Sequence, residues 1–238
     1  MAHVGLEPQA VRSAVSRLKK RGILLSDRRE GVSGYALSEY AESVLAEGDR
    51  RIFKREEPQE ADWVLAVFSV PEAERDKRHA LRSRLSWLGF ATISSGTWIA
   101  PAHVADDARL VLARDDLDRF VELFHADHLG FGDVAALVGK WWDLAGIDGR
   151  YRDFIAECQP VLSSWEAREH PDEFAAEAFA DYVRVLTRWR QLPYLDPGLP
   201  PTLRPAGWSG ATAADLFAAL RDKLEGPAHQ YAAPPPAR

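Results

Sequence analysis

The stretch from residue 7 to residue 25, EPQAVRSAVSRLKKRGILL, constrains the fold of this chain most, because an apolar stripe in it stops at a glycine. The stripe has the spacing of a single helix face and consists of Val11, Ala14, Val15 and Leu18. Pro8 suits the first helical position, and Gly22 suits the left-handed position just past the end. The pattern predicts an amphipathic helix that leads directly into a strand.

The polar face of this predicted helix carries hydrogen-bonding side chains of two lengths, and we expect it to contact DNA. The expected base-edge contacts are Gln9, Arg12, Ser13 and Ser16, and the expected phosphate contacts are Arg17 and Lys20. The next residues predict a small hairpin with Arg28 and Arg29 at its tip, directed at the flanking minor groove or phosphates. Helix, glycine, strand and basic hairpin follow one another in this order in a winged helix-turn-helix.

The distribution of charge supports contact between this front module and nucleic acid. Residues 1–30 carry seven Lys or Arg against three Asp or Glu, a net charge of +4, although the whole chain has a formal net charge of −6. A helix with a polar outer face is often merely solvated, so the helix alone is weak evidence. A basic hairpin directly after it, in an otherwise acidic chain, favours DNA binding.

Long blocks of the sequence resemble a known family. They include GLEPQAVRSAVSRLKKRGILL, GYALSEYAESVLAEGDRRIF and WWDLAGIDGRYRDFI, and they are similar to the phenylacetate-catabolism repressors, the PaaX-like transcriptional regulators. The resemblance implies a homodimeric DNA-binding repressor of an aromatic-acid catabolic operon, released by an aryl-acyl-coenzyme A effector. In that family two helices precede the segment corresponding to residues 5–25, so we expect this chain to start inside its DNA-binding domain.

The rest of the sequence predicts two further parts, so the expected fold class is α+β with several domains. Residues 1–53 would form the partial winged helix-turn-helix with a connecting helix over 39–53. A buried strand, WVLAVFSV, opens a strand, helix, strands, helix, strand series that predicts a ferredoxin-like central domain over 60–131. With the family resemblance in view, we interpret this domain as the dimerisation domain. Apolar stripes predict an α-helical C-terminal domain over 133–226, and residues 227–238 are expected to be disordered.

A metal-dependent nuclease is the alternative function, because in the family the central domain resembles the small CRISPR-associated ferredoxin-like nucleases. Those enzymes carry an Asp at the end of the first strand, where this chain has Ser69, Val70 and Pro71. His125 and His128 are expected on opposite faces of a closing strand, with no third metal ligand evident. We therefore predict no catalytic or metal-binding residue. A truncated remnant that dimerises without binding DNA is a further alternative.

Two other patterns have simple structural interpretations. GFGDVA, residues 130–135, matches a dinucleotide-binding pattern but lacks an alternating βαβ series around it, so we expect its glycines in a turn and Asp133 as a helix cap. Cys158 shares a helix face with Tyr151 and Leu162, as a buried small apolar residue would. Neither pattern therefore predicts a nucleotide-binding or catalytic site.

Three arginines at helical spacing are the candidate contacts for the phosphates of the effector. Arg75, Arg78 and Arg82 alternate with acidic residues, so a solvated helix face is the competing interpretation. The single cysteine suits a reducing compartment, and neither a signal peptide nor an apolar run of about 20 residues is evident. The sequence thus predicts a cytoplasmic protein with no membrane partner and no cofactor.

Overall fold

The computed structural model describes residues 5, 7–29, 31–53 and 62–232, which group into two compact units. Unit 1 comprises Met1–Arg55, Glu157–Trp189 and Asp215–Arg238, and unit 2 comprises Glu56–Ala156 and Arg190–Ala214. The sequence had predicted three successive domains. The grouping differs because the unit boundaries fall inside two long helices, α6 (Leu144–Glu166) and α9 (Gly210–Ala232).

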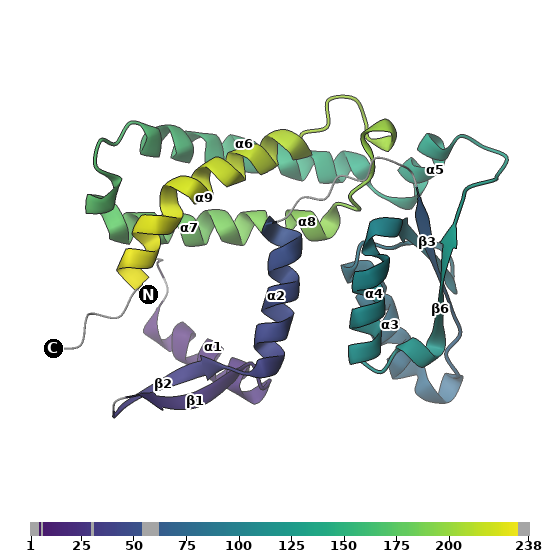
Figure 1. Ribbon diagram of the computed structural model, residues 1–238, viewed down its shortest axis with the longest axis horizontal. Helices are drawn as coiled ribbons and strands as arrows, with labels where there is room; N and C mark the ends of the chain where they lie inside the picture. The colour runs from purple at the N-terminus through teal and green to yellow at the C-terminus, as the bar shows by residue number, and fades with distance from the viewer. Residues whose placement is uncertain (1–4, 6, 30, 54–61, 233–238) are drawn as a thin grey trace. The chain divides into compact units, whose positions relative to one another are not determined.

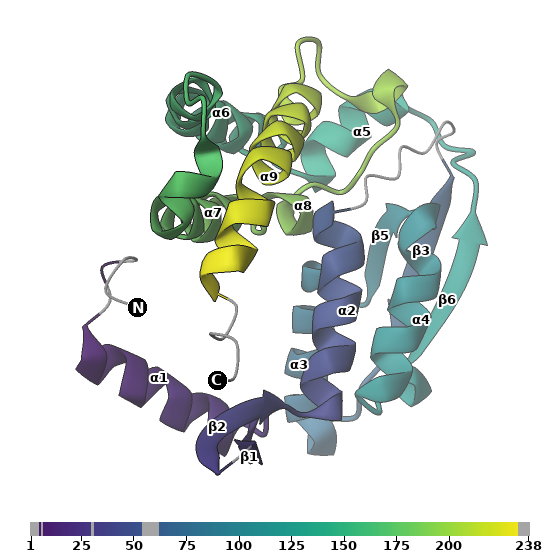
Figure 2. The same ribbon diagram turned by 60° about the vertical axis from the view of Figure 1, so that its left-hand side comes forward.

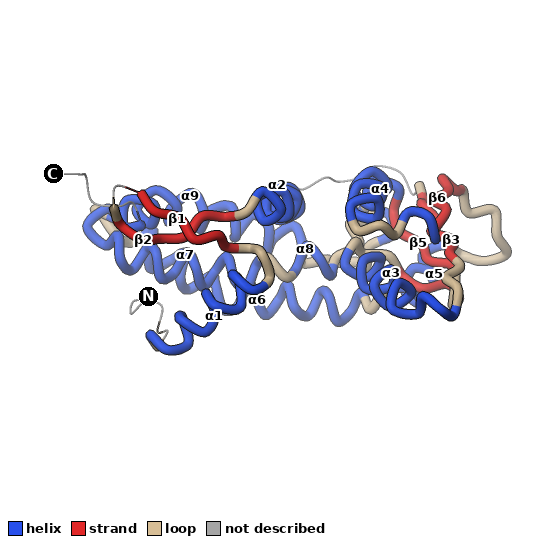
Figure 3. Tube along the Cα trace, turned by 90° about the horizontal axis from the view of Figure 1, so that it is seen from below, coloured by secondary structure: helices blue, strands red, loops and turns tan. Residues whose placement is uncertain are grey.

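Unit 1 begins with the predicted helix and hairpin. Helix α1 (Pro8–Lys20) has Pro8 in its first turn, and Gly22 follows it with a φ of +70°. Strands β1 (Leu24–Arg29) and β2 (Val32–Leu37) then pair antiparallel, and Figure 3 shows them as a two-stranded ribbon beside α1. Helix α2 (Glu39–Phe53) matches the connecting helix expected over 39–53 (Figure 2).

Aromatic side chains anchor the end of α2 within unit 1. Trp189, the last residue of α7 (Ala175–Trp189), donates its indole N–H to the carbonyl of Ile52 over 2.9 Å. The Trp189 ring also stacks on the Phe217 ring of α9 at a centroid distance of 4.8 Å. The Phe53 ring lies 6.0 Å from the Phe217 ring. These contacts fix the far end of the helix that leaves the hairpin.

Helix α9 corrects the expectation of a disordered tail from residue 227. The helix continues through Pro227 to Ala232, with Ala228 buried and the Tyr231 ring 5.4 Å from that of Phe179. Apolar contacts of the last turn therefore outweigh the helix-breaking tendency of Pro227. Residues 233–238 lie outside the described residues.

Unit 2 contains a four-stranded antiparallel sheet in the order β4-β5-β3-β6, as expected of a ferredoxin-like domain. The strands are β3 (Trp63–Phe68), β4 (Ala91–Ser94), β5 (Thr97–Pro101) and β6 (Val121–Ala126). Helices α3 (Arg75–Trp87) and α4 (Ala105–Arg114) lie together on one face of this sheet (Figure 1). The predicted apolar edge of α3, formed by Leu81, Leu85 and Leu88, is buried in the core beneath these helices.

The remaining elements that the structure describes are short helices and 3₁₀ turns. Helix α5 (Val134–Trp141) and helix α8 (Leu192–Leu195) belong to unit 2. In the described part of the chain, the 3₁₀ turns are η2 (Glu72–Glu74), η3 (Ala102–Val104), η4 (Asp118–Phe120), η5 (Pro171–Phe174) and η6 (Pro201–Leu203). Among the residues that the structure describes, no helix has the length and apolar character required to cross a bilayer.

Candidate nucleic-acid interface

The two sides of α1 differ as the sequence predicted. The residues expected on its polar side are all exposed: Gln9, Arg12, Ser13, Ser16, Arg17 and Lys20. The apolar stripe of Val11, Ala14 and Val15 is only half-buried, Leu18 is 36% exposed, and no described residue of α1 is buried. The polar side is thus free to meet a ligand, while the apolar side is only partly covered.

A serine that the sequence reasoning missed joins three elements of this module. The hydroxyl of Ser38 donates to the carbonyl of Gly22 over 2.6 Å and accepts from the backbone N–H of Ala41 at 3.1 Å. The N–H of Ser38 donates to the carbonyl of Ile23 over 3.0 Å. Ser38 therefore caps α2 and ties its start to the end of α1. A serine directly before a helix with an acidic first turn is a start signal that could have revealed it.

The hairpin presents one face to the end of α1. Lys19 of α1 donates from Nζ to the Ser26 hydroxyl over 2.8 Å, and its Nζ lies 5.5 Å from the centre of the Tyr35 ring. Strand pairing sets Ser26 opposite Tyr35 and Arg28 opposite Ser33, so all four side chains lie on this face. The basic surface of α1 therefore continues onto the hairpin.

The arginines at the hairpin tip and on the helix have different surroundings. Arg28 is exposed and donates from Nε to the carbonyl of Gly31 over 3.2 Å. Arg29 pairs with Val32 in the ladder, and its side chain lies outside what the structure describes. Arg12 donates to the side-chain oxygen of Gln9 over 3.3 Å, so the two expected base-edge contacts hold one another one turn apart.

The three candidate effector arginines on α3 are not equivalent. Arg78 donates to the Glu72 carboxylate over 3.1 Å and to the carbonyl of Val70 over 2.8 Å, and it is half-buried. Arg82 is exposed and donates to the carbonyl of Ser95 over 3.1 Å, and Arg75 is exposed. Arg78 thus fastens α3 to the turn before it, which favours a structural role for that residue.

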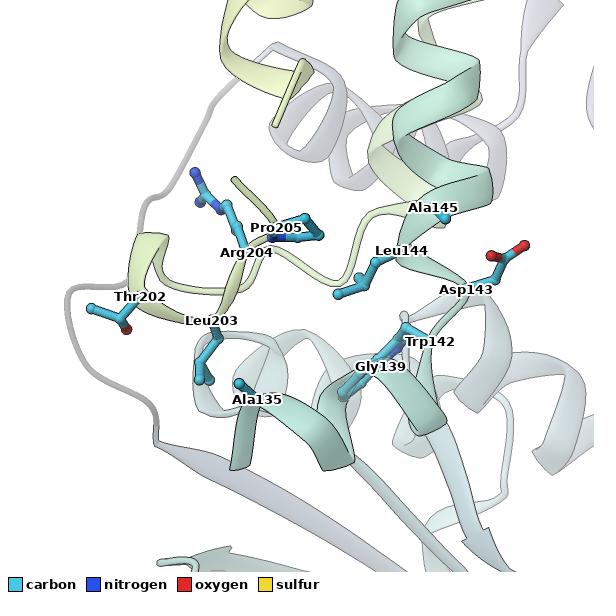
Figure 4. Close-up of a pocket in the computed structure, with 10 residues that line it drawn as sticks. All are labelled: Ala135, Gly139, Trp142, Asp143, Leu144, Ala145, Thr202, Leu203, Arg204 and Pro205. Atoms are coloured by element: carbon cyan, nitrogen blue, oxygen red, sulfur yellow. The ribbon is translucent and has the colours of Figure 1, made fainter. Parts of the chain in front are cut away.

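A pocket of about 390 Å³ lies elsewhere in unit 2, and none of these three arginines lines it. Its lining residues are Ala135, Gly139, Trp142, Asp143, Leu144, Ala145, Thr202, Leu203, Arg204 and Pro205 (Figure 4). Arg204 directs its guanidinium away from Trp142 in Figure 4, and its Nε donates to the carbonyl of Leu199 over 2.6 Å. The slot between Trp142, Leu144 and Leu203 is therefore mainly apolar.

The structure shows where the residues lie that resembled a metal site or a nucleotide-binding pattern in the sequence. Strand β6 ends at Ala126, so His128 lies in the loop that follows, and the prediction that it lies on a strand face was wrong. In the described part of the chain, no three His, Cys, Asp or Glu side chains are grouped as a metal would require. Asp133 caps α5, as predicted, by accepting from the N–H of Ala135 at 3.3 Å.

Cys158 is buried, as predicted. Burial, together with the neighbouring Glu157 carboxylate, raises the pKa of its thiol to about 11. A thiol with so high a pKa is almost entirely protonated at neutral pH and is a poor nucleophile. The environment of Cys158 therefore suits a side chain that packs in the core and does not suit a catalytic nucleophile.

These observations define a multidomain α+β protein that combines an N-terminal helix and hairpin, a ferredoxin-like domain and C-terminal helices. Three family profiles match it in succession: "PaaX-like protein" over residues 1–41, "PaaX protein central Cas2-like domain" over 56–138, and "PaaX-like protein C-terminal domain" over 142–234. The chain belongs to the PaaX-like family.

Individual relatives agree with this assignment. The chain is 26% identical over 218 residues to the transcriptional repressor PaaX of Escherichia coli K12, covering 90% of this chain and 68% of that protein. It is thus a distant homologue of a repressor. The solved structure of the uncharacterized protein Rv0674 from Mycobacterium tuberculosis has a TM-score of 0.59 and 23% identity, covering 96% of this chain and 85% of that one. At this identity the similarity shows a shared fold.

Proposed function

We propose that this protein is a homodimeric transcriptional repressor that binds double-stranded operator DNA through α1 and the β1–β2 hairpin. The observation that carries the proposal is the polar surface that runs from α1 across Lys19 and Ser26 to Arg28 on the hairpin. A helix inserted in the major groove with a hairpin on the adjacent backbone requires such continuity. The distant homology to a repressor supports the same assignment.

Roles within this surface follow from side-chain length and position. Gln9, Arg12, Ser13 and Ser16 lie on the exposed side of α1 and would read base edges. Arg17 and Lys20 are nearer the hairpin and would contact phosphates. Arg28 and Arg29 would hold the flanking backbone or minor groove.

Footprinting on the region upstream of the protein's own transcription unit tests the proposal. A homodimer should protect two half-sites whose centres lie about 34 Å, one helical turn, apart. The lack of any protected site at low salt would contradict the proposal. The alternative of a metal-dependent nuclease predicts cleavage of the same DNA after addition of Mg²⁺ or Mn²⁺, whereas we expect the DNA to stay intact.

The proposed function includes release from DNA by an aryl-acyl-coenzyme A formed in aromatic-acid catabolism, which makes the controlled genes a catabolic operon. The apolar slot beside Trp142 is our candidate for the acyl group, since about 390 Å³ is within the usual range for small-molecule sites. Arg75 and Arg82 remain candidate phosphate contacts, and Arg78 is a weaker one because Glu72 already pairs with it.

Filling the slot tests its assignment. Gly139 of α5 lines the pocket, and a Cβ added there would meet nothing within 4 Å, so we expect the side chain of Gly139→Leu to take up part of the pocket. Gly149→Leu is the matched control, since it too is a helical glycine with open space around it and does not line the pocket. We expect Gly139→Leu to weaken calorimetric binding of an aryl-acyl-coenzyme A and Gly149→Leu to leave it unchanged. Equal binding by both variants would contradict the assignment.

A further inference from the structure

We propose that Trp189 is a positioning residue for DNA binding: it holds the far end of α2 and thereby sets the direction in which α1 and the hairpin meet DNA. The inference rests on the proposed function in one respect, because that direction matters only for a protein that binds DNA. The anchoring itself is argued from contacts within unit 1. Trp189 would touch no DNA and would act only through α2.

The start of α2 is tied to the surface proposed to bind DNA. Ser38 caps the helix and donates from its hydroxyl to the carbonyl of Gly22, just after α1. The N–H of Ser38 donates to the carbonyl of Ile23, and Ala41 in the first turn of α2 is buried. A tilt of α2 is therefore passed on to the hairpin and to the end of α1.

The covered side of α2 does little to hold the helix at one angle. Ala41 and Gly48 are buried on this side, and Val44 is half-buried. Leu45, directly after Val44, is 49% exposed. Burial stabilises in proportion to the apolar area that it removes from water, so an alanine and a glycine contribute little. The angle of α2 therefore depends on contacts at its far end.

The length of α2 amplifies any movement at that end. With 15 residues, each rising about 1.5 Å, the helix is about 22 Å long. A tilt of about 10° at the far end moves the start of the helix by about 4 Å, which exceeds the length of a hydrogen bond. Hydrogen bonds from α1 to base edges would not survive such a displacement.

Trp189 supplies a hydrogen bond that the last turn of α2 cannot make within the helix. The carbonyl groups at the end of an α-helix have no intrahelical partner. Ile52 lies in the last turn of α2, and its carbonyl accepts from the Trp189 indole N–H over 2.9 Å. Trp189 is itself only 5% exposed. The end of α2 is thus capped by a side chain of α7 that packing holds in place.

Aromatic rings from three helices surround this hydrogen bond. The Trp189 ring of α7 stacks on the Phe217 ring of α9, with the centroids 4.8 Å and the planes 12° apart. The Phe53 ring of α2 lies 6.0 Å from the Phe217 ring, and the Arg221 guanidinium lies 5.9 Å from the centre of the Phe53 ring. The end of α2 is therefore held by one hydrogen bond and by ring contacts, which a substitution can separate.

Replacement of Trp189 by Phe removes the hydrogen bond and keeps a ring. Trp189→Phe can still stack on Phe217 but has no N–H for the Ile52 carbonyl. Trp165→Phe is the matched control, because Trp165 is also buried and donates its indole N–H to the Asp181 carboxylate over 2.9 Å, a contact that joins α6 to α7. Circular dichroism establishes folding. If Trp189→Phe does not fold, benzothienylalanine at position 189 replaces it, with sulfur in place of the N–H and the bicyclic ring kept.

Hydrogen exchange of the full chain without DNA tests the anchoring. We expect the amides in the last turn of α2, from Arg50 to Phe53, to exchange about fivefold faster in Trp189→Phe than in the parent chain, since one hydrogen bond of ordinary strength is lost. Trp165→Phe should leave these amides unchanged. Unchanged exchange in Trp189→Phe would overturn the proposal, as would the same acceleration in Trp165→Phe.

DNA fragments with altered half-site spacing test the positioning, because a purely structural role of Trp189 would not change the preferred spacing. One base pair inserted between the half-sites moves them apart by about 3.4 Å and rotates one against the other by about 35°. The probe is the fragment found by footprinting, with and without this insertion. The parent chain and Trp165→Phe should bind the longer fragment at least about tenfold more weakly, and Trp189→Phe only about threefold more weakly, because loosely held helices can follow both half-sites.

The two measurements allow the inference and the proposed function to fail separately. A spacing preference of Trp189→Phe equal to that of the parent chain would overturn the positioning role. An operator footprint together with unchanged exchange at the end of α2 would sink only the anchoring by Trp189. Faster exchange without any operator footprint of the parent chain would sink the repressor function and leave the anchoring of α2 standing.

Discussion

The ammonium group of Lys19, in the last turn of α1, lies 2.8 Å from the hydroxyl of Ser26 on β1. The same group lies 5.5 Å from the centre of the Tyr35 ring on β2. A single side chain thus connects the helix that would enter the major groove with the hairpin that would hold the backbone beside it. Lys19 and its neighbour Lys20 should therefore have different roles despite equal charge.

Substitution of these two lysines separates positioning from phosphate contact. Lys20 is exposed, so Lys20→Met should weaken binding to all DNA sequences alike and reduce the slope of log affinity against log salt by about 1. Lys19→Met should instead loosen the hairpin, which faster amide exchange at Ser26 and Tyr35 would report. Identical exchange in the two variants would contradict the bridging role of Lys19.

Ser38 should stabilise the N-terminal part of the chain formed by α1, the β1–β2 hairpin and α2. Ser38→Ala removes both the cap of α2 and the hydrogen bond to Gly22, so we expect a loss of about 1–2 kcal/mol in the free energy of unfolding. Denaturant unfolding followed by circular dichroism measures it. Ser33→Ala, at an exposed position on β2, should change the free energy by less than about 0.5 kcal/mol. An equal effect of the two substitutions would refute the capping role.

Hydrogen exchange should differ sharply between α1 and β3. The central strand β3 is hydrogen-bonded to β5 and β6 and has Trp63, Val64 and Ala66 buried, so its amides should exchange slowly. No described residue of α1 is buried, so amides from Val11 to Leu18 should exchange fast in the absence of DNA. Mass spectrometry of peptic fragments gives both rates. Strong protection of α1 in the free protein would contradict this expectation.

Cys158 should be unreactive in the folded chain. Because burial raises the pKa of its thiol to about 11, alkylation by iodoacetamide at pH 8 should be far slower for the folded chain than for the chain in urea. The raised pKa also means that the thiol favours folding below about pH 9, its ordinary value, and that this contribution is lost as the pH rises toward about 11. Equal alkylation rates in both states would contradict the burial of Cys158.

Local patterns in the sequence predicted most of the elements, and long-range contacts explain what they missed. The stripe of α1, Gly22 after it, and the continuous apolar strand β3 all follow from residues close in sequence. The hydrogen bond from Trp189 to the carbonyl of Ile52 joins residues 137 positions apart, and no periodicity encodes it.

The candidate site shows the same division. Its exposed arginines and serines could be chosen from helical spacing alone, because spacing decides which face they share. The contact of Lys19 with Ser26 could not be predicted, because it depends on the angle at which the hairpin leaves Gly22. Likewise, the division of the helices between two units depends on packing that single stripes do not specify.

Fluorescence anisotropy with operator and random DNA tests the central claim, that α1 reads DNA sequence, most directly. Arg12→Ala should weaken operator binding by about 1–3 kcal/mol and random-DNA binding much less. Arg109→Ala removes the same charge from an exposed position on α4 and should leave the difference between the two DNAs unchanged. If Arg12→Ala weakens binding to operator DNA and to random DNA by equal amounts, as Arg109→Ala would, α1 is not the helix that reads the DNA sequence.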